Sequence, residues 1–78
     1  MKTIKILGSG CAKCNKLYEL ADQAAGELGI DYQMEKVSDI DKFADYGVMV
    51  TPALVVDGKV KSTGKLPVLD KLKEYISD

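Results

Sequence analysis

Two cysteines separated by two residues, Cys11 and Cys14, lie between a segment typical of a β-strand and a segment typical of an α-helix. They are the only cysteines in the 78-residue sequence. A Cys-x-x-Cys sequence at a strand-to-helix turn, in a chain with cytosolic character, indicates a dithiol redox site. A disulfide that closes so short a loop removes little entropy from the unfolded chain, which argues against a purely structural disulfide. The pair therefore favours a fold in which a strand leads directly into a helix.

The hydrophobic pattern on either side of the cysteines predicts a strand, a helix and a second strand. Residues 3–7 alternate between polar and apolar side chains, as in a half-buried strand. From Ala12 to Leu28 the apolar positions recur every three or four residues, which predicts one buried face of a helix. Residues 30–37 alternate again and predict the second strand.

Two further helices are expected. Residues 39–46 form a short helical segment, and Ser38 with Asp41 resembles a capping pair at its start. The apolar positions between Leu66 and Ile76 mark one face of a terminal helix. Pro67 is acceptable in the first turn of that helix, because its missing N–H would have no partner within the helix.

Two short strands, residues 53–56 and 59–62, flank Asp57-Gly58, a dipeptide favoured in two-residue hairpin turns. The predicted order is therefore β-α-β-α-β-β-α. A strand–helix–strand unit gives a right-handed parallel crossover, and the hairpin adds antiparallel strands. We expect one α/β domain over residues 1–78, with a mixed four-stranded sheet and helices on both faces.

Composition excludes several classes of protein. The net charge is −1, from 11 basic and 12 acidic residues, so no overall field favours nucleic acid or anionic lipid. The longest apolar runs are too short to span a membrane, and the first residues lack a signal-peptide core, so we expect a cytoplasmic protein. Histidine is absent, which excludes a Ser-His-Asp triad, a Cys-His pair and an imidazole metal site within this chain.

The element order, with Cys11-Ala12-Lys13-Cys14 at the first strand-to-helix turn, Thr51-Pro52 before the hairpin and Gly64 after the fourth strand, resembles the thioredoxin fold. It is similar in particular to the small, glutaredoxin-sized prokaryotic redox-active disulfide proteins, over essentially the whole chain. The resemblance implies a thiol–disulfide oxidoreductase that acts on protein disulfides and is re-reduced by a flavin-dependent donor like thioredoxin reductase. It also implies that Pro52 is cis and that its loop faces the cysteine pair. We expect a monomer.

The chain departs from the family pattern at three places. Gly10 and Ala12-Lys13 replace the Trp and the Gly-Pro that commonly surround the first cysteine. Lys5 stands where many thioredoxins carry a buried Asp; it either faces solvent or approaches Cys14. A single Gly64 replaces the Gly-Gly segment of glutaredoxins, which favours protein partners over glutathione.

Cys11 is the expected nucleophile, because the unpaired N–H groups and the dipole at a helix start favour the reactive thiolate. Cys14 belongs to the apolar stripe of the helix and is the expected resolving thiol. Lys13 either lowers the pKa of the Cys11 thiol or is an ordinary solvated lysine. The expected substrate-docking residues are Gly10, Ala12, Thr51, Pro52 and Gly64. We expect no bound organic cofactor and no metal ion, since the cysteine pair itself carries the electrons.

Two other functions stay open. A soft-metal chaperone for Cu(I) or Zn also places a Cys-x-x-Cys loop between a strand and a helix, and thiolates suit Cu(I). Such chaperones usually carry Met two residues before the first cysteine, where this chain has Ser9, and they end in a strand. The remaining alternative is a redox-sensing interaction module.

Overall fold

The computed structural model describes residues 1–77, which form one four-stranded sheet and three helices. The strands β1 (Lys2–Leu7), β2 (Tyr32–Val37), β3 (Ala53–Val56) and β4 (Lys59–Thr63) lie in the order β2-β1-β3-β4. β1 pairs in parallel with β2 and antiparallel with β3, and β3 pairs antiparallel with β4. The mixed sheet expected from the sequence is confirmed.

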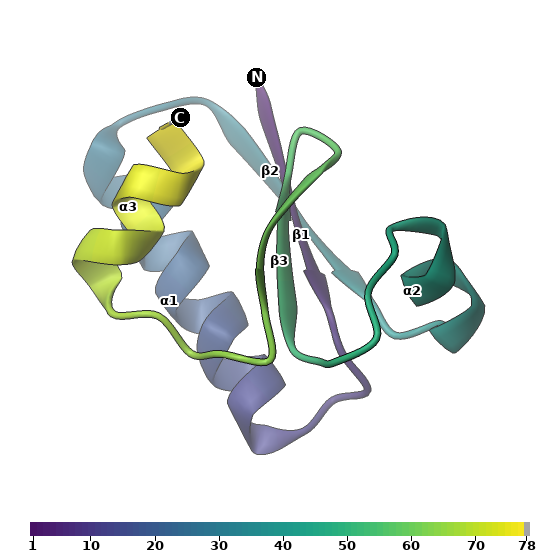
Figure 1. Ribbon diagram of the computed structural model, residues 1–78. Helices are drawn as coiled ribbons and strands as arrows, with labels where there is room; N and C mark the ends of the chain where they lie inside the picture. The colour runs from purple at the N-terminus through teal and green to yellow at the C-terminus, as the bar shows by residue number, and fades with distance from the viewer. Residues whose placement is uncertain (78) are drawn as a thin grey trace.

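The helices cover both faces of the sheet. Helices α1 (Ala12–Leu28) and α3 (Leu69–Ser77) pack on one face, and the short α2 (Ile40–Asp45) lies on the other (Figure 1). The larger core fills the α1–α3 side; its fully buried residues include Ile4, Ile6, Leu17, Leu54, Leu72 and Ile76. A smaller core under α2 comprises Leu7, Val37, Phe43, Val48, Ala53 and Val55. In the described part of the chain no helix is long and apolar enough to cross a membrane.

The hairpin between β3 and β4 forms as its sequence predicts. Asp57 and Gly58 both have positive φ, 51° and 82°. Two consecutive residues in this region are what a type I′ turn requires, which explains the Asp-Gly sequence. The Asp57 carboxylate accepts a hydrogen bond from the Thr3 amide at 2.9 Å, and this bond lowers its pKa below the ordinary value.

Several boundaries differ from the sequence prediction by one to three residues. β2 begins at Tyr32 rather than residue 30, because its ladder starts opposite Lys2, near the beginning of the chain. Asp39, not Ser38, caps α2; its carboxylate accepts a hydrogen bond from the Asp41 amide at 3.0 Å.

The terminal helix also begins later than expected, so Pro67 lies outside it. Leu72 N–H donates to the Val68 carbonyl at 3.0 Å, and α3 is helical from Leu69. The residue before a proline is disfavoured in helical conformation, which accounts for Leu66 lying outside the helix. Val68, whose carbonyl accepts the bond from Leu72, directly precedes α3.

The pairing brings several loops to one edge of the sheet. Leu7, the last residue of β1, lies opposite both Val37 and Ala53, and Ala53 lies opposite Thr63. The segments that follow β1, β2 and β4, and the segment that precedes β3, therefore leave the sheet together. In Figure 1 this is the lower edge, where α1 also begins.

Candidate active site

Cys11 occupies the N-cap position of α1. Its φ of −67° and ψ of 164° are extended, so the helix begins at the next residue, and the preceding Gly10 turns the loop with φ of 88°. The Cys11 Sγ atom accepts a hydrogen bond from the Cys14 amide at 3.2 Å, in the way that a Ser or Asp side chain caps a helix. The Cys11 sulfur thus lies against the N–H groups at the positive end of the helix dipole.

Cys11 and Cys14 form a disulfide, with their Cα atoms 5.0 Å apart. The two residues differ in exposure: Cys11 is exposed, whereas Cys14 is only 2% exposed. One cysteine of the bridge is therefore open to a partner and the other is enclosed. Ala12 and Lys13, between them, are exposed as well.

Gly8 packs directly against the enclosed cysteine, a contact that the sequence analysis missed. A Cβ atom built on Gly8 would lie 2.9 Å from the Cys14 Cβ and closer still to its Sγ. The Gly8 amide donates to the Val37 carbonyl at 2.9 Å, which fixes the glycine at the end of β1. The signal was present in the alternation of β1, because Gly8 follows Ile4 and Ile6 on the face that α1 covers.

The Thr51-Pro52 segment begins β3 at the same edge of the sheet as the cysteine loop. The Thr51–Pro52 bond is cis, as the resemblance implied, and the Pro52 side chain is fully buried. The Pro52 carbonyl accepts a hydrogen bond from the Gly64 amide at 2.7 Å. A Cβ on Gly64 would lie 2.6 Å from Cγ1 of Val50, so Gly64 leaves room for the residue before Thr51.

The segment ahead of Pro52 exposes apolar side chains. Met49 is 95% exposed and Val50 is 58% exposed, and neither carries a polar group.

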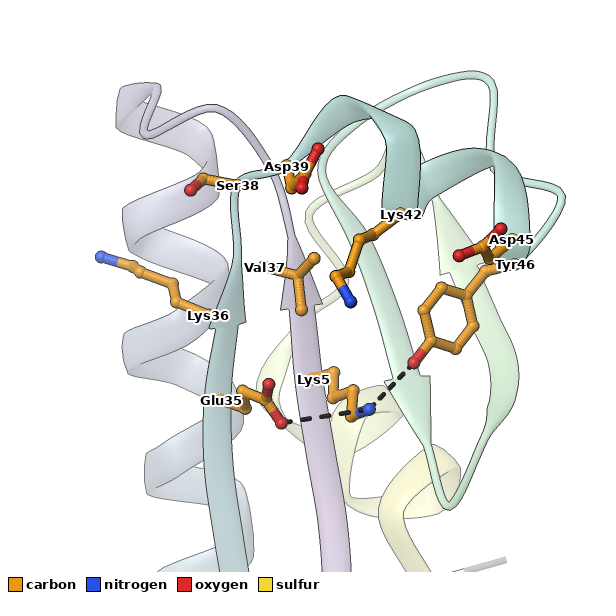
Figure 2. A pocket seen from close by; sticks show the side chains of 9 residues that line it. All are labelled: Lys5, Glu35, Lys36, Val37, Ser38, Asp39, Lys42, Asp45 and Tyr46. Atoms are coloured by element: carbon orange, nitrogen blue, oxygen red, sulfur yellow. Dashed lines mark hydrogen bonds and ion pairs between the residues drawn. The ribbon is translucent and has the colours of Figure 1, made fainter.

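Lys5 does not approach the cysteines. Cys14 lies on the side of the sheet that α1 covers, whereas the Lys5 side chain lies on the α2 side, where its Nζ donates to the Tyr46 hydroxyl at 2.9 Å (Figure 2). Glu35 lies 3.9 Å from the same Nζ. The hydrogen bond to Tyr46 raises the pKa of Lys5, and Glu35 adds a smaller effect in the same direction.

These residues line a hollow of about 360 Å³ between β2 and α2, in which Lys42 also points toward Lys5 and Tyr46. The hollow lies on the face of the sheet opposite α1, and none of its lining residues belongs to the cysteine loop. Within residues 1–77 no three His, Cys, Asp or Glu side chains are grouped as metal ligands would be.

Comparison with known proteins gives a consistent result. A family model described as the thioredoxin domain matches residues 2–77. A thioredoxin of Methanocaldococcus jannaschii is 42% identical over 76 residues, covering 97% of this chain and 87% of the relative. A thioredoxin of Methanothermobacter thermautotrophicus is 38% identical over 77 residues, covering 99% of this chain and all of the relative. A probable thioredoxin of Methanothermobacter marburgensis is 37% identical over 71 residues, covering 87% of this chain and 82% of the relative.

These matches extend over nearly the whole chain, and this chain carries a Cys11–Cys14 disulfide at the start of α1. The protein is a thiol–disulfide oxidoreductase that uses a Cys-x-x-Cys dithiol. The terminal helix α3 agrees with this assignment and differs from the terminal strand of the soft-metal chaperones considered above. The chain belongs to the thioredoxin domain family.

Proposed function

We propose that Cys11 is the attacking thiolate of the reaction. The observation that carries this proposal is the asymmetry of the disulfide: an exposed sulfur at the N-cap of α1, bonded to an enclosed sulfur one turn later. When the pair is reduced, the N–H groups and the helix dipole that face Cys11 stabilise its anion, which lowers its pKa below the value of about 8.5 for a free cysteine. Lys13 adds a positive charge in the same turn.

Cys14 is the resolving thiol. The Cys11 thiolate attacks one sulfur of the substrate disulfide; the substrate S–S bond breaks, a mixed disulfide forms, and the released thiolate takes a proton from solvent. Cys14 then loses its proton and attacks the Cys11 sulfur, which re-forms the internal bond and releases the second substrate thiol. Two electrons and two protons pass to the substrate. The internal disulfide then needs an external reductant, for which a flavin-dependent enzyme like thioredoxin reductase is the proposed donor.

The proposed substrates are disulfides in other proteins, and the proposed working form is one cytoplasmic, monomeric domain of residues 1–78 without a bound organic cofactor. We propose that substrates dock at the edge of the sheet that the segments of Thr51, Pro52 and Gly64 share with the loop of the exposed Gly10 and Ala12. Proline has no N–H, so its position leaves the Thr51 backbone available to pair with an extended substrate segment.

The docking proposal is tested with Pro52→Ala. We expect KM for a protein disulfide to rise several-fold while the alkylation rate of Cys11 stays within twofold of the wild type. Unchanged KM and kcat would remove the support for docking at Thr51-Pro52. A matched change at the far end of the same hairpin, Lys59→Ala, is expected to alter neither quantity.

The roles of the two sulfurs are tested with Cys11→Ser and Cys14→Ser. Cys11→Ser is expected to abolish insulin-disulfide reduction, while Cys14→Ser accumulates a mixed disulfide that a non-reducing gel resolves. Mixed disulfides formed through Cys14 in the Cys11→Ser protein would reverse the assignment. Stoichiometric binding of Cu(I) or Zn(II) by the reduced protein in competition with physiological thiols, with no turnover, would favour the metal chaperone instead. Slow turnover with a partner affinity that changes on oxidation would favour the sensor.

A further inference from the structure

The first two turns of α1 carry positively charged side chains, whereas the start of a helix is usually stabilised by negatively charged ones. The first turn of α1 contains no acidic residue, and the first carboxylate anywhere in the chain is Glu19. Lys13 and Lys16 occupy the first two turns instead. Because the N-terminal end of a helix carries partial positive charge, cations there reduce helix stability, whereas Asp or Glu would increase it. Helix stability therefore does not explain this arrangement.

A third lysine from outside the helix joins the first two. Lys36, near the end of β2, donates a hydrogen bond to Asn15 Oδ1 at 3.0 Å, and its Nζ lies 5.2 Å from the centre of the Tyr18 ring. Figure 2 shows its side chain directed away from the hollow under α2. Both contacts hold the Lys36 charge beside the first two turns of α1. We call Lys13, Lys16 and Lys36 the lysine collar.

The collar is not neutralised by carboxylates. Among residues 1–77 neither Lys13 nor Lys16 makes an ion pair, although Glu19 lies only one turn from Lys16. Elsewhere lysines do have carboxylate partners, such as Lys73 with Glu27 at 2.7 Å. Side chains on a helix lean toward its N-terminus, so the charges of Lys13 and Lys16 are carried toward Cys11. A chain of net charge −1 thus places three lysines without a carboxylate partner among residues 1–77 on or beside the first two turns of the helix that Cys11 caps.

We propose that the lysine collar selects protein disulfides whose flanking residues are acidic. This inference rests on the proposed function, because it concerns what docks at Cys11. Opposite charges across an interface raise the association rate and exclude wrongly charged partners, and the effect is strongest at low ionic strength. Met49 and Val50, exposed at the same edge of the sheet, carry no charge of their own.

The test uses three synthetic peptides with one internal disulfide, identical except for flanking positions that hold Glu, Ser or Lys. The reduced protein is mixed with each peptide, and the second-order rate of peptide reduction is measured at about 0.01 M and about 1 M salt, where the Debye length is about 30 Å and about 3 Å. We expect the Glu peptide to react on the order of tenfold faster than the Lys peptide at low salt, and the ratio to approach one at high salt. The Ser peptide should fall between them.

The ratio of the reduction rates of the Glu and Lys peptides does not depend on the reactivity of Cys11 itself, because that reactivity affects both rates equally. The variant Lys16→Gln/Lys36→Gln is expected to reduce that ratio at least threefold. The control Lys59→Gln/Lys71→Gln has the same net charge but removes exposed lysines outside the collar, and it should keep the wild-type ratio. Equal rates for the Glu and Lys peptides would overturn the inference, and so would an equal loss of the rate ratio in both double variants. In either case, reduction of the Ser peptide would leave the proposed function intact. Failure to reduce any peptide would contradict the proposed function instead.

Discussion

Gly8→Ala tests the close packing between the end of β1 and the enclosed sulfur. The new Cβ would lie 2.9 Å from the Cys14 Cβ, whereas carbon atoms in contact prefer separations of about 3.5–4.0 Å. The first turn of α1 or the end of β1 must therefore move by about 0.6 Å or more. Gly8 is held by its bond to Val37, and Cys14 belongs to a helix whose next inward residue, Leu17, is fully buried. Movement on either side thus disturbs packed structure.

Overpacking of this kind typically costs about 1–3 kcal/mol. For a chain of this size the whole free energy of unfolding is about 4–12 kcal/mol, so the loss is measurable by urea denaturation of the oxidised protein. We also expect the displaced Cys14 sulfur to attack Cys11 more slowly, which would lengthen the lifetime of the mixed disulfide. That kinetic readout separates an effect on the resolving thiol from a general loss of stability.

Two controls make the Gly8 result specific. Gly26→Ala places a methyl group in the same helix, where its nearest neighbour is the Tyr32 hydroxyl at 3.8 Å, and it should stabilise the protein by about 0.5–1 kcal/mol. In a Cys14→Ala background part of the Gly8→Ala penalty should disappear, because the sulfur contact is gone. A free energy of unfolding for Gly8→Ala within about 0.5 kcal/mol of the wild type, or the same penalty in both backgrounds, would refute the reasoning.

Three further predictions follow from individual contacts. Gly64→Ala forces a side chain onto a residue with φ of 67° and into Val50, so it should lower the free energy of unfolding by about 1–2 kcal/mol; a urea midpoint equal to the wild type would contradict this. Leu72→Ala removes a fully buried side chain between α3 and the sheet, and calorimetry should show a loss of about 2–5 kcal/mol; a loss below about 1 kcal/mol would mean that the core is not packed as described. Lys73 donates to Glu27 and lowers the pKa of that carboxyl below its ordinary value of 4.5. The pair therefore stabilises the fold above pH 4.5, and this contribution is lost as the pH falls through the lowered pKa. The Tm difference between the wild type and Glu27→Gln should therefore be full near neutral pH and shrink in acid; a difference that grows in acid would contradict this sign.

Local patterns predicted most of the architecture. The alternation of β1, the three-and-four spacing of α1 and the Asp57-Gly58 turn each depend on neighbours in the sequence, and all three are confirmed. The two errors at helix starts differ in kind: at α2 two adjacent residues both have capping chemistry, whereas at α3 the helix begins two residues after the proline. Asp39 caps α2 in place of Ser38, and Pro67 stays outside α3.

Contacts between distant residues could not be predicted in this way. Lys5 bonds to Tyr46, 41 residues away, on a face that the alternation of β1 identified without naming a partner. The alternation of β1 places Gly8 on the face that α1 covers, but the packing of Gly8 on Cys14 also depends on how closely α1 approaches β1, which the alternation does not give. The candidate site was therefore predicted through its cysteines and Pro52, while the residues that enclose Cys14 emerged only from the fold.

The most direct test of the account is the pH dependence of alkylation of the reduced protein by iodoacetamide, with the modified cysteine identified by peptide mass mapping. The account predicts that Cys11 reacts first and at neutral pH, with an apparent pKa below about 8.5, and that Cys14 stays protected until the protein unfolds. Preferential modification of Cys14, or a Cys11 sulfur that reacts only above that pKa, would contradict it.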